Sequence, residues 1–231
     1  MNTFNKNTLL GDIVSEFPGA ADFFIERQID FCCGGDRSLE AGVKEQGLSL
    51  EETLEALNQA FQEFKTREEE YIDWANANSK KLIDHILLAH HQYLKEELPQ
   101  LSLLIFKLLR VHGDTHSELF DLHALMGMLR TELESHLVKE ELWLFPLVEK
   151  LENATSEEEI SKILKLIDDL EEDHDTAGDA LKKLRELTDH YTAPADGCTT
   201  YNHTFERLRA FEKNMFEHVH LENNVMFKKY K

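Results

Sequence analysis

The chain repeats one pattern, HLVKEELWLF at residues 136–145 and HVHLENNVMF at residues 218–227. Each copy has a histidine, a glutamate four positions later and a phenylalanine nine positions after the histidine. Residues four apart lie one above the other on a helix, so each histidine and its glutamate share one face. His136 with Glu140, and His218 with Glu222, can therefore each present a nitrogen and an oxygen to the same point.

A further histidine precedes each copy, His91 before the first and His174 before the second. The sequence thus contains an approximate duplication of a helix pair that supplies His plus His-x-x-x-Glu. Apolar residues at alternating three- and four-residue steps predict four helices, over Ile83–Ile105, Leu122–Leu147, Ile160–Leu184 and Leu208–Val225. We therefore expect an all-α chain with an up-down four-helix bundle.

Each predicted apolar seam is interrupted only where one of six polar residues falls. These are His91, His136, Glu140, His174, His218 and Glu222. A single histidine on such a seam is usually a hydrogen-bonded core residue, but several buried imidazoles and carboxylates need one another or a metal. Mixed imidazole and carboxylate ligation suits iron, although zinc and manganese accept the same donors. The pattern predicts a metal site at one level of the bundle core.

The composition limits the kinds of partner. The 231 residues, 42% of them hydrophobic, are enough for one sizeable core and a small accessory domain. A formal charge of −20 repels nucleic acid and anionic lipid head groups, so we expect neither as a partner. The N-terminus lacks a signal-peptide pattern and no apolar stretch is long enough to span a membrane. These features predict a cytoplasmic protein.

The chain is expected to have two domains. Residues 1–65 carry short helical patterns around the turn FCCGGD and form a small helical domain with a Cys-Cys-Gly-Gly motif. Residues 66–78 are charged and polar, with little apolar periodicity, and form a linker. Residues 79–231 form the four-helix bundle.

Three cysteines, two of them adjacent, do not make the disulfide framework of a secreted protein. Cys32 and Cys33 are either small apolar residues at a turn or reactive thiols. Charge does not decide between these alternatives, because Arg37 favours a thiolate and Asp30 opposes one. We carry both cysteines as candidate redox thiols.

Two features lie outside the predicted metal site. Cys198 precedes the fourth helix, where a helix N-terminus can lower a thiol pKa, but an ordinary loop cysteine fits the sequence as well. His112 and His116 are four residues apart near a predicted helix end, about 30 Å along the axis from His91. Zinc binding by this pair is the lesser alternative, because Gly113 lies between the two histidines.

Several segments resemble one known family over nearly the whole chain. They are IDFCCGGDRSLEAG at residues 29–42, IDHILLAHHQYLKEELPQL at 83–101, EEDHDTAGD at 171–179 and the two repeat copies. The chain resembles the iron-sulfur cluster repair di-iron proteins, the ScdA or "repair of iron centres" family. The resemblance implies a hemerythrin-like bundle after the small domain. It also implies that the six seam residues hold two non-haem iron ions with carboxylate and oxo bridges.

The same resemblance implies a function. It is the repair of iron-sulfur clusters damaged by oxidative or nitrosative stress, by iron donation or nitric oxide chemistry at a labile centre. Oxygen-carrying hemerythrins have a second histidine one turn after the first on their third helix, where this chain has Gly178. One histidine fewer implies a more open site. The resemblance also implies a redox or iron-handling role for Cys32 and Cys33.

Expected partners are damaged iron-sulfur proteins as clients, nitric oxide or oxygen as small ligands, and a second copy of the chain in a homodimer. Two rival functions stay open. One is an oxygen or nitric oxide sensor of the hemerythrin type, and the other is a nitric oxide reductase or ferroxidase. The sequence therefore does not decide whether the protein is an enzyme.

Overall fold

The computed structural model describes residues 3–66, 72–151 and 157–231. Within these ranges the regular structure is helical, with one isolated β-bridge between Leu9 and Ser38. The predicted all-α class is confirmed. Part of the predicted linker, residues 67–71, lies outside the described residues. Among the helices that are described, none is both long and apolar enough to cross a membrane.

The chain divides into two compact units. One consists of Met1–Leu82 with Phe216–Lys231, and the other of Ile83–Met215. The last residues of the chain therefore group with its beginning, although they continue the fourth long helix. The predicted domain limits, 1–65 and 79–231, stay a prediction.

The N-terminal part of the first unit consists of four helices. They are α1 (Leu10–Glu16), α2 (Ala20–Glu26), α3 (Leu39–Glu45) and α4 (Leu50–Thr66). Phenylalanine rings form the centre of its core: Phe61 of α4 stacks on Phe4 at 4.5 Å between ring centroids and contacts Phe17 at 5.6 Å. Ser38 caps α3, because its hydroxyl accepts the backbone N–H of Ala41. Burial of these aromatic rings stabilises the packing of the helices, and the cap stabilises the start of α3.

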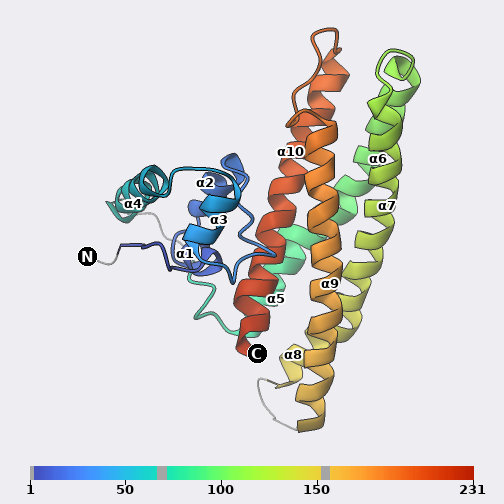
Figure 1. Ribbon diagram of the computed structural model, residues 1–231. Helices are drawn as coiled ribbons and strands as arrows, with labels where there is room; N and C mark the ends of the chain where they lie inside the picture. The colour runs from blue at the N-terminus through green and yellow to red at the C-terminus, as the bar shows by residue number, and fades with distance from the viewer. Residues whose placement is uncertain (1–2, 67–71, 152–156) are drawn as a thin grey trace. The chain divides into compact units, whose positions relative to one another are not determined.

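Four helical runs follow, as the apolar periodicity predicts. Their α-helical parts are α5 (Ser79–Ile86), α6 (Gln92–His112), α7 (Glu118–Lys139), α8 (Phe145–Leu151), α9 (Glu157–Leu187) and α10 (Thr199–His220). Figure 1 shows α6, α7, α9 and α10 running alongside one another. Their facing positions are apolar and buried, for example Leu98, Leu129, Leu170 and Leu208. Burial of these seams is the main contribution to the bundle's stability.

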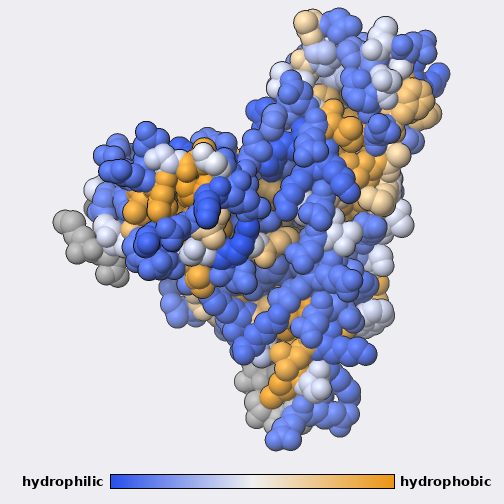
Figure 2. Space-filling model, viewed as in Figure 1, coloured by the Kyte–Doolittle hydropathy of each residue, from blue (hydrophilic) through white to orange (hydrophobic). Residues whose placement is uncertain are grey.

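Short turns of other helix types interrupt or end these runs. Three are π-helical, η1 (Leu87–His91), η2 (Glu140–Leu144) and η3 (Leu221–Met226), and one is a 3₁₀ turn, η4 (Phe227–Lys229). The surface drawn in Figure 2 is mostly hydrophilic, with small apolar patches. This distribution agrees with the large excess of acidic residues in the sequence.

A buried ion pair lies inside the second unit. The Arg185 guanidinium of α9 approaches the Glu212 carboxylate of α10 at 2.8 Å, and both side chains are buried. Burial raises the pKa of Glu212 despite the opposing attraction of Arg185. Each charge therefore depends on the other, because an uncompensated charge in this position is costly.

Replacing Glu212 with alanine should lower the free energy of unfolding by about 3 kcal/mol, since the Arg185 charge is left buried without its partner. Urea titration of the metal-free protein, followed by circular dichroism, measures this change. Glu206→Ala removes an exposed glutamate from the same helix and should alter stability by less than about 0.5 kcal/mol. Equal losses in the two variants would contradict a stabilising role for the buried pair.

Candidate metal centre

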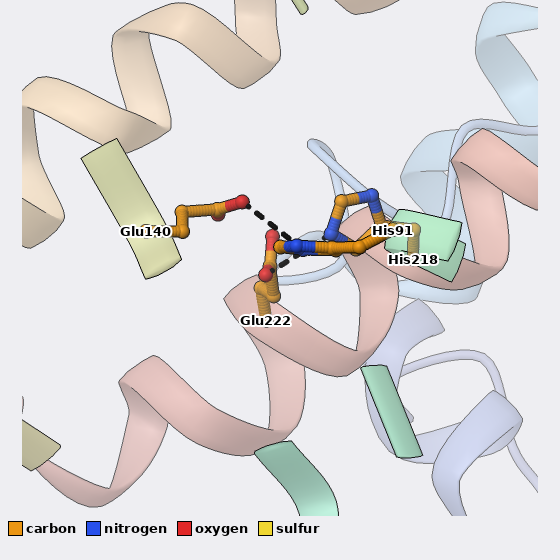
Figure 3. A group of neighbouring side chains, drawn as sticks. All are labelled: His91, Glu140, His218 and Glu222. Atoms are coloured by element: carbon orange, nitrogen blue, oxygen red, sulfur yellow. Dashed lines mark ion pairs between the residues drawn. The ribbon is translucent and has the colours of Figure 1, made fainter. Parts of the chain in front are cut away.

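The structure brings the six predicted ligands together in two overlapping groups. One contains His91, Glu140, His218 and Glu222, and the other His136, Glu140, His174 and Glu222. Within each group the candidate ligand atoms lie within 4.8 Å of one another, and every side chain is buried. Figure 3 shows the first group, with its side chains directed toward a common point. Both groups contain both carboxylates.

Glu140 lies between histidines of both groups. Its Oε2 is 3.3 Å from Nε2 of His91, while its Oε1 is 3.1 Å from Nε2 of His136 and 3.9 Å from Nε2 of His174. The two oxygens of one carboxylate therefore face different histidines. This is the geometry of a carboxylate that can bind two cations at once.

The second repeat copy supplies the matching pair. On the helical run from α10 into η3, Nε2 of His218 lies 3.1 Å from Oε1 of Glu222. His136 Nε2 and His174 Nε2 are 3.1 Å apart and point at each other. Four imidazoles and two carboxylates thus present nitrogen and oxygen atoms to one small volume. Iron, zinc and manganese ions all accept a donor set of this kind.

π-Helical turns occur at the predicted ligands on three of the helical runs. His91 ends η1, Glu140 begins η2 and Glu222 lies in η3. π-Helical turns are rare in proteins, and those that occur are often found at functional sites. His174 differs, because α9 continues past it as a regular α-helix.

Two of the histidines are oriented by carboxylates on the far side of the ring. His91 Nδ1 lies 2.8 Å from Oε1 of Glu141, which also binds the ammonium group of Lys95 at 2.6 Å. Although burial raises it, the pKa of Glu141 is lowered by its hydrogen bonds with Lys95 and His91. A carboxylate on Nδ1 fixes the tautomer that leaves Nε2 free to bind a metal.

His136 has the equivalent partner in Asp173. Its Nδ1 is 3.3 Å from Oδ2 of Asp173, and the ammonium group of Lys139 is 2.5 Å from the same oxygen. The hydrogen bond with His136 and the contact with Lys139, against the effect of burial, lower the pKa of Asp173 to about 2. Neither supporting carboxylate was predicted from the sequence. The available signal was that each is adjacent in sequence to a predicted ligand.

A cavity of about 210 Å³ borders His136 and His174. Its other lining residues include Glu132, Glu172 and Asp173. This volume is several times that of a water molecule, so a diatomic ligand fits in it. Gly178, where an oxygen-carrying hemerythrin would have a further histidine, is buried in α9 one turn after His174.

The structure also brings the two adjacent cysteines together with Asp30. Asp30 Oδ1 accepts the backbone N–H groups of Cys32, Cys33 and Gly34 at 3.1 to 3.2 Å. The Cys32 sulfur lies 4.0 Å from that of Cys33, and neither cysteine is in a disulfide. The hydrogen bond with Cys33 and burial raise the pKa of Cys32 well above its ordinary value. Cys32 is therefore a protonated thiol at rest, and a redox role for the pair stays a prediction.

Asn224 holds the loop that carries these cysteines. Its side-chain amide donates to the carbonyl oxygens of Phe31 and Cys32, at 3.2 and 2.9 Å. A Cβ atom at Gly35 would lie only 2.1 Å from Oδ1 of Asn224, so the close approach requires a residue without a side chain. Asn224 follows Glu222 by two residues and was not recognised from the sequence.

Two family models match the chain, one in its N-terminal part and one in its C-terminal part. Residues 82–230 match the model described as the Hemerythrin HHE cation binding domain, and residues 6–61 match ScdA_N, described as a domain of unknown function. The first match covers more than half of the chain. The expected bundle type and the expected family therefore have independent support.

Named relatives match nearly the whole length of the chain. The chain is 34% identical over 225 residues to the iron-sulfur cluster repair protein ScdA of Staphylococcus epidermidis, covering 97% of this chain and 98% of the relative. It is 33% identical over 218 residues to the iron-sulfur cluster repair protein YtfE of an Enterobacter species, covering 94% of each. The YtfE protein of Escherichia coli is 33% identical over 220 residues, with 94% of each chain covered.

Replacing Glu141 with alanine should weaken metal binding roughly 10- to 100-fold, because His91 loses the carboxylate that orients its ring. Competition with a chromophoric chelator measures the dissociation constant. Glu134→Ala, on the exposed surface of α7, is the matched control and should bind metal like the parent protein. Unchanged affinity in the Glu141 variant would show that its contact with His91 does not support the site.

Proposed function

The chain belongs to the family of iron-sulfur cluster repair proteins, and we propose that it repairs iron-sulfur clusters damaged by oxidative or nitrosative stress in the cytoplasm. In this chain an ScdA_N module precedes a hemerythrin HHE domain. The observation that carries this proposal is the pair of ligand groups that share Glu140 and Glu222. A shared pair of carboxylates suits a centre that holds more than one metal ion.

We infer that the centre holds two iron ions. His91 and His218 would bind one, His136 and His174 would bind the other, and Glu140 and Glu222 would bridge them. An oxo group would complete the bridge. Iron bound by these residues would supply electron-transfer chemistry toward nitric oxide or oxygen and would also be the material from which a cluster is rebuilt.

The chain's own residues prepare this site. Burial of Glu140 and Glu222 excludes water from the donors, and the contacts with Glu141 and Asp173 orient His91 and His136. Such preorganisation reduces the rearrangement needed on metal binding. Glu132 and Asp173, which line the cavity beside His136, place negative charge there. Negative charge favours passage of a cation, which supports iron donation.

A second candidate function has one specific observation in its favour. The cavity beside His174, with Gly178 in place of a further histidine, has room for nitric oxide or oxygen. A sensor would bind either ligand reversibly without rebuilding a cluster. A nitric oxide reductase would form nitrous oxide over many turnovers. We favour repair because the full-length relatives are named for that activity.

The proposed clients are iron-sulfur proteins whose clusters have been damaged. A dehydratase inactivated by peroxide or nitric oxide provides the direct test, since its activity returns only when its cluster is rebuilt. The iron-loaded protein should restore activity, and the metal-free protein should not. Equal recovery with free ferrous iron at the same concentration would contradict the proposal.

Sedimentation of the same preparation tests the proposed homodimer.

Glu140→Gln and Glu222→Gln should each lower the iron content below two ions per chain, because each removes an anionic bridge from both groups. Iron analysis and the dehydratase assay report the two effects together. Glu206→Gln, an exposed position on α10, should keep both iron and repair activity. Two tightly bound irons in both bridging variants would exclude the assigned role for the carboxylates.

The double variant Cys32→Ser with Cys33→Ser should retain its iron and lose most of its repair activity, because these thiols are proposed to accept iron or supply electrons to the client. Both properties are measured in the full-length chain. Cys198→Ser removes a thiol outside this loop and is the control. Normal repair by the double variant would show that the thiols are dispensable.

A further inference from the structure

We propose that Cys198 is a thiol modification site: paired with His112, its sulfur attacks a low-molecular-weight disulfide and forms a mixed disulfide at the end of the bundle remote from the metal centre. Cys198 is exposed and immediately precedes α10. His218 lies 20 residues further along the same helical run, about 30 Å along its axis at the usual rise. The site is therefore separate from the proposed iron ligands.

The sulfur of Cys198 has an imidazole within hydrogen-bond distance. Nε2 of His112, the last residue of α6, lies 3.4 Å from Sγ of Cys198. Figure 1 shows the α6–α7 turn and the α9–α10 connection at the same end of the bundle. A nucleophile with an adjacent base is the arrangement that activates a cysteine for attack.

A third residue fixes the base. The Tyr201 side chain is almost fully buried, and its ring centroid lies 5.4 Å from that of His112 and 5.7 Å from that of His116. The three rings pack at steep angles, between 67° and 71° for the two contacts with Tyr201. Packing against a buried ring restricts the His112 rotamer, so the imidazole stays directed at the sulfur.

The surroundings stabilise the thiolate. The hydrogen bond with His112 has the largest effect, followed by the backbone N–H of Tyr201 and then that of Thr200, and together they lower the pKa of Cys198 to about 7. The two backbone groups belong to the first turn of α10, whose positive end favours a negative charge. Cys198 therefore carries more thiolate at neutral pH than an ordinary thiol does.

Three titratable groups at this end of the bundle, His116, Glu118 and Asp196, are hydrogen-bonded to one another. His116 binds Glu118 through Nδ1 at 2.9 Å and Asp196 through Nε2 at 3.1 Å. The hydrogen bonds with Glu118 and Asp196 raise the pKa of His116. Asp196, two residues before Cys198, thus has a hydrogen-bonding partner in His116, which limits its repulsion of the thiolate. His112 and His116 each face a different partner instead of a common metal position.

The reaction is an exchange in which the incoming disulfide is the oxidant. The Cys198 thiolate attacks one sulfur, a new sulfur–sulfur bond forms and the original one breaks. The electron pair of the broken bond leaves with the departing thiolate, which takes its proton from His112 or from water. Cys198 is oxidised to one half of the mixed disulfide, and the departing thiol is the reduced product.

Oxidised glutathione serves as the probe on the full-length protein. Mass spectrometry of the Cys198 peptide measures the rate of adduct formation across pH. The rate should rise with a midpoint near pH 7 in the parent protein, because the thiolate is the reacting form. In His112→Gln the midpoint should move up by about one pH unit, and the rate at neutral pH should fall roughly fivefold.

His203→Gln is the matched control, since His203 is an exposed histidine early in α10. It should leave the midpoint unchanged. A parent protein whose Cys198 reacts with the midpoint of an ordinary thiol, near pH 8.5, would overturn the proposal whether or not the variants fold. Stoichiometric zinc retained at His112 and Cys198, with protection from the probe, would overturn it as well.

Discussion

Burial of two carboxylates in an apolar bundle is the constraint on which the rest of the structure depends. Glu140 and Glu222 are fully enclosed, and a buried anion needs a compensating positive charge. The imidazoles grouped around them are neutral donors when a metal binds, so the cation itself supplies most of the compensation. Metal binding and stability of the bundle core are thus linked, because the ligands are only assembled in the folded chain.

The helices of the duplicated sequence differ in their local structure at the candidate ligands. In both His-x-x-x-Glu copies a π-helical turn begins at or next to the glutamate, in η2 and η3. The helices that supply a single histidine differ from each other, since His91 ends a π-helical turn and His174 lies in regular helix. A π-helical turn adds a residue without breaking the helix, which changes the direction of the following side chains. The two repeat copies are therefore most alike at their His-x-x-x-Glu pairs, where a nitrogen and an oxygen must lie close together.

The features that the sequence predicts are those with a periodic signal. Apolar residues at alternating three- and four-residue steps identified the four long helices, and the polar residues that interrupt these seams identified the six candidate ligands. The π-helical turns left no such signal, since they differ from α-helix in hydrogen bonding and not in residue type. Glu141 and Asp173 were hidden among the 45 acidic residues of the chain. Contacts such as His112 with Cys198, 86 residues apart, depend on the tertiary fold alone.

The cysteines show how the same side chain acquires opposite properties. Cys198, exposed beside His112 at a helix start, is stabilised as a thiolate, whereas Cys32 is buried beside a second thiol and the Asp30 carboxylate and keeps its proton. A protonated thiol is a poor ligand for iron, and a thiolate is a strong one. Arrival of a cation at Cys32 and Cys33 would have to displace a proton, and the same cation would relieve the repulsion that Asp30 exerts on the thiolate. A dithiol of this kind would exchange protons for metal, so the proposed uptake of iron by the loop should be weakened by acid and strengthened as the pH rises.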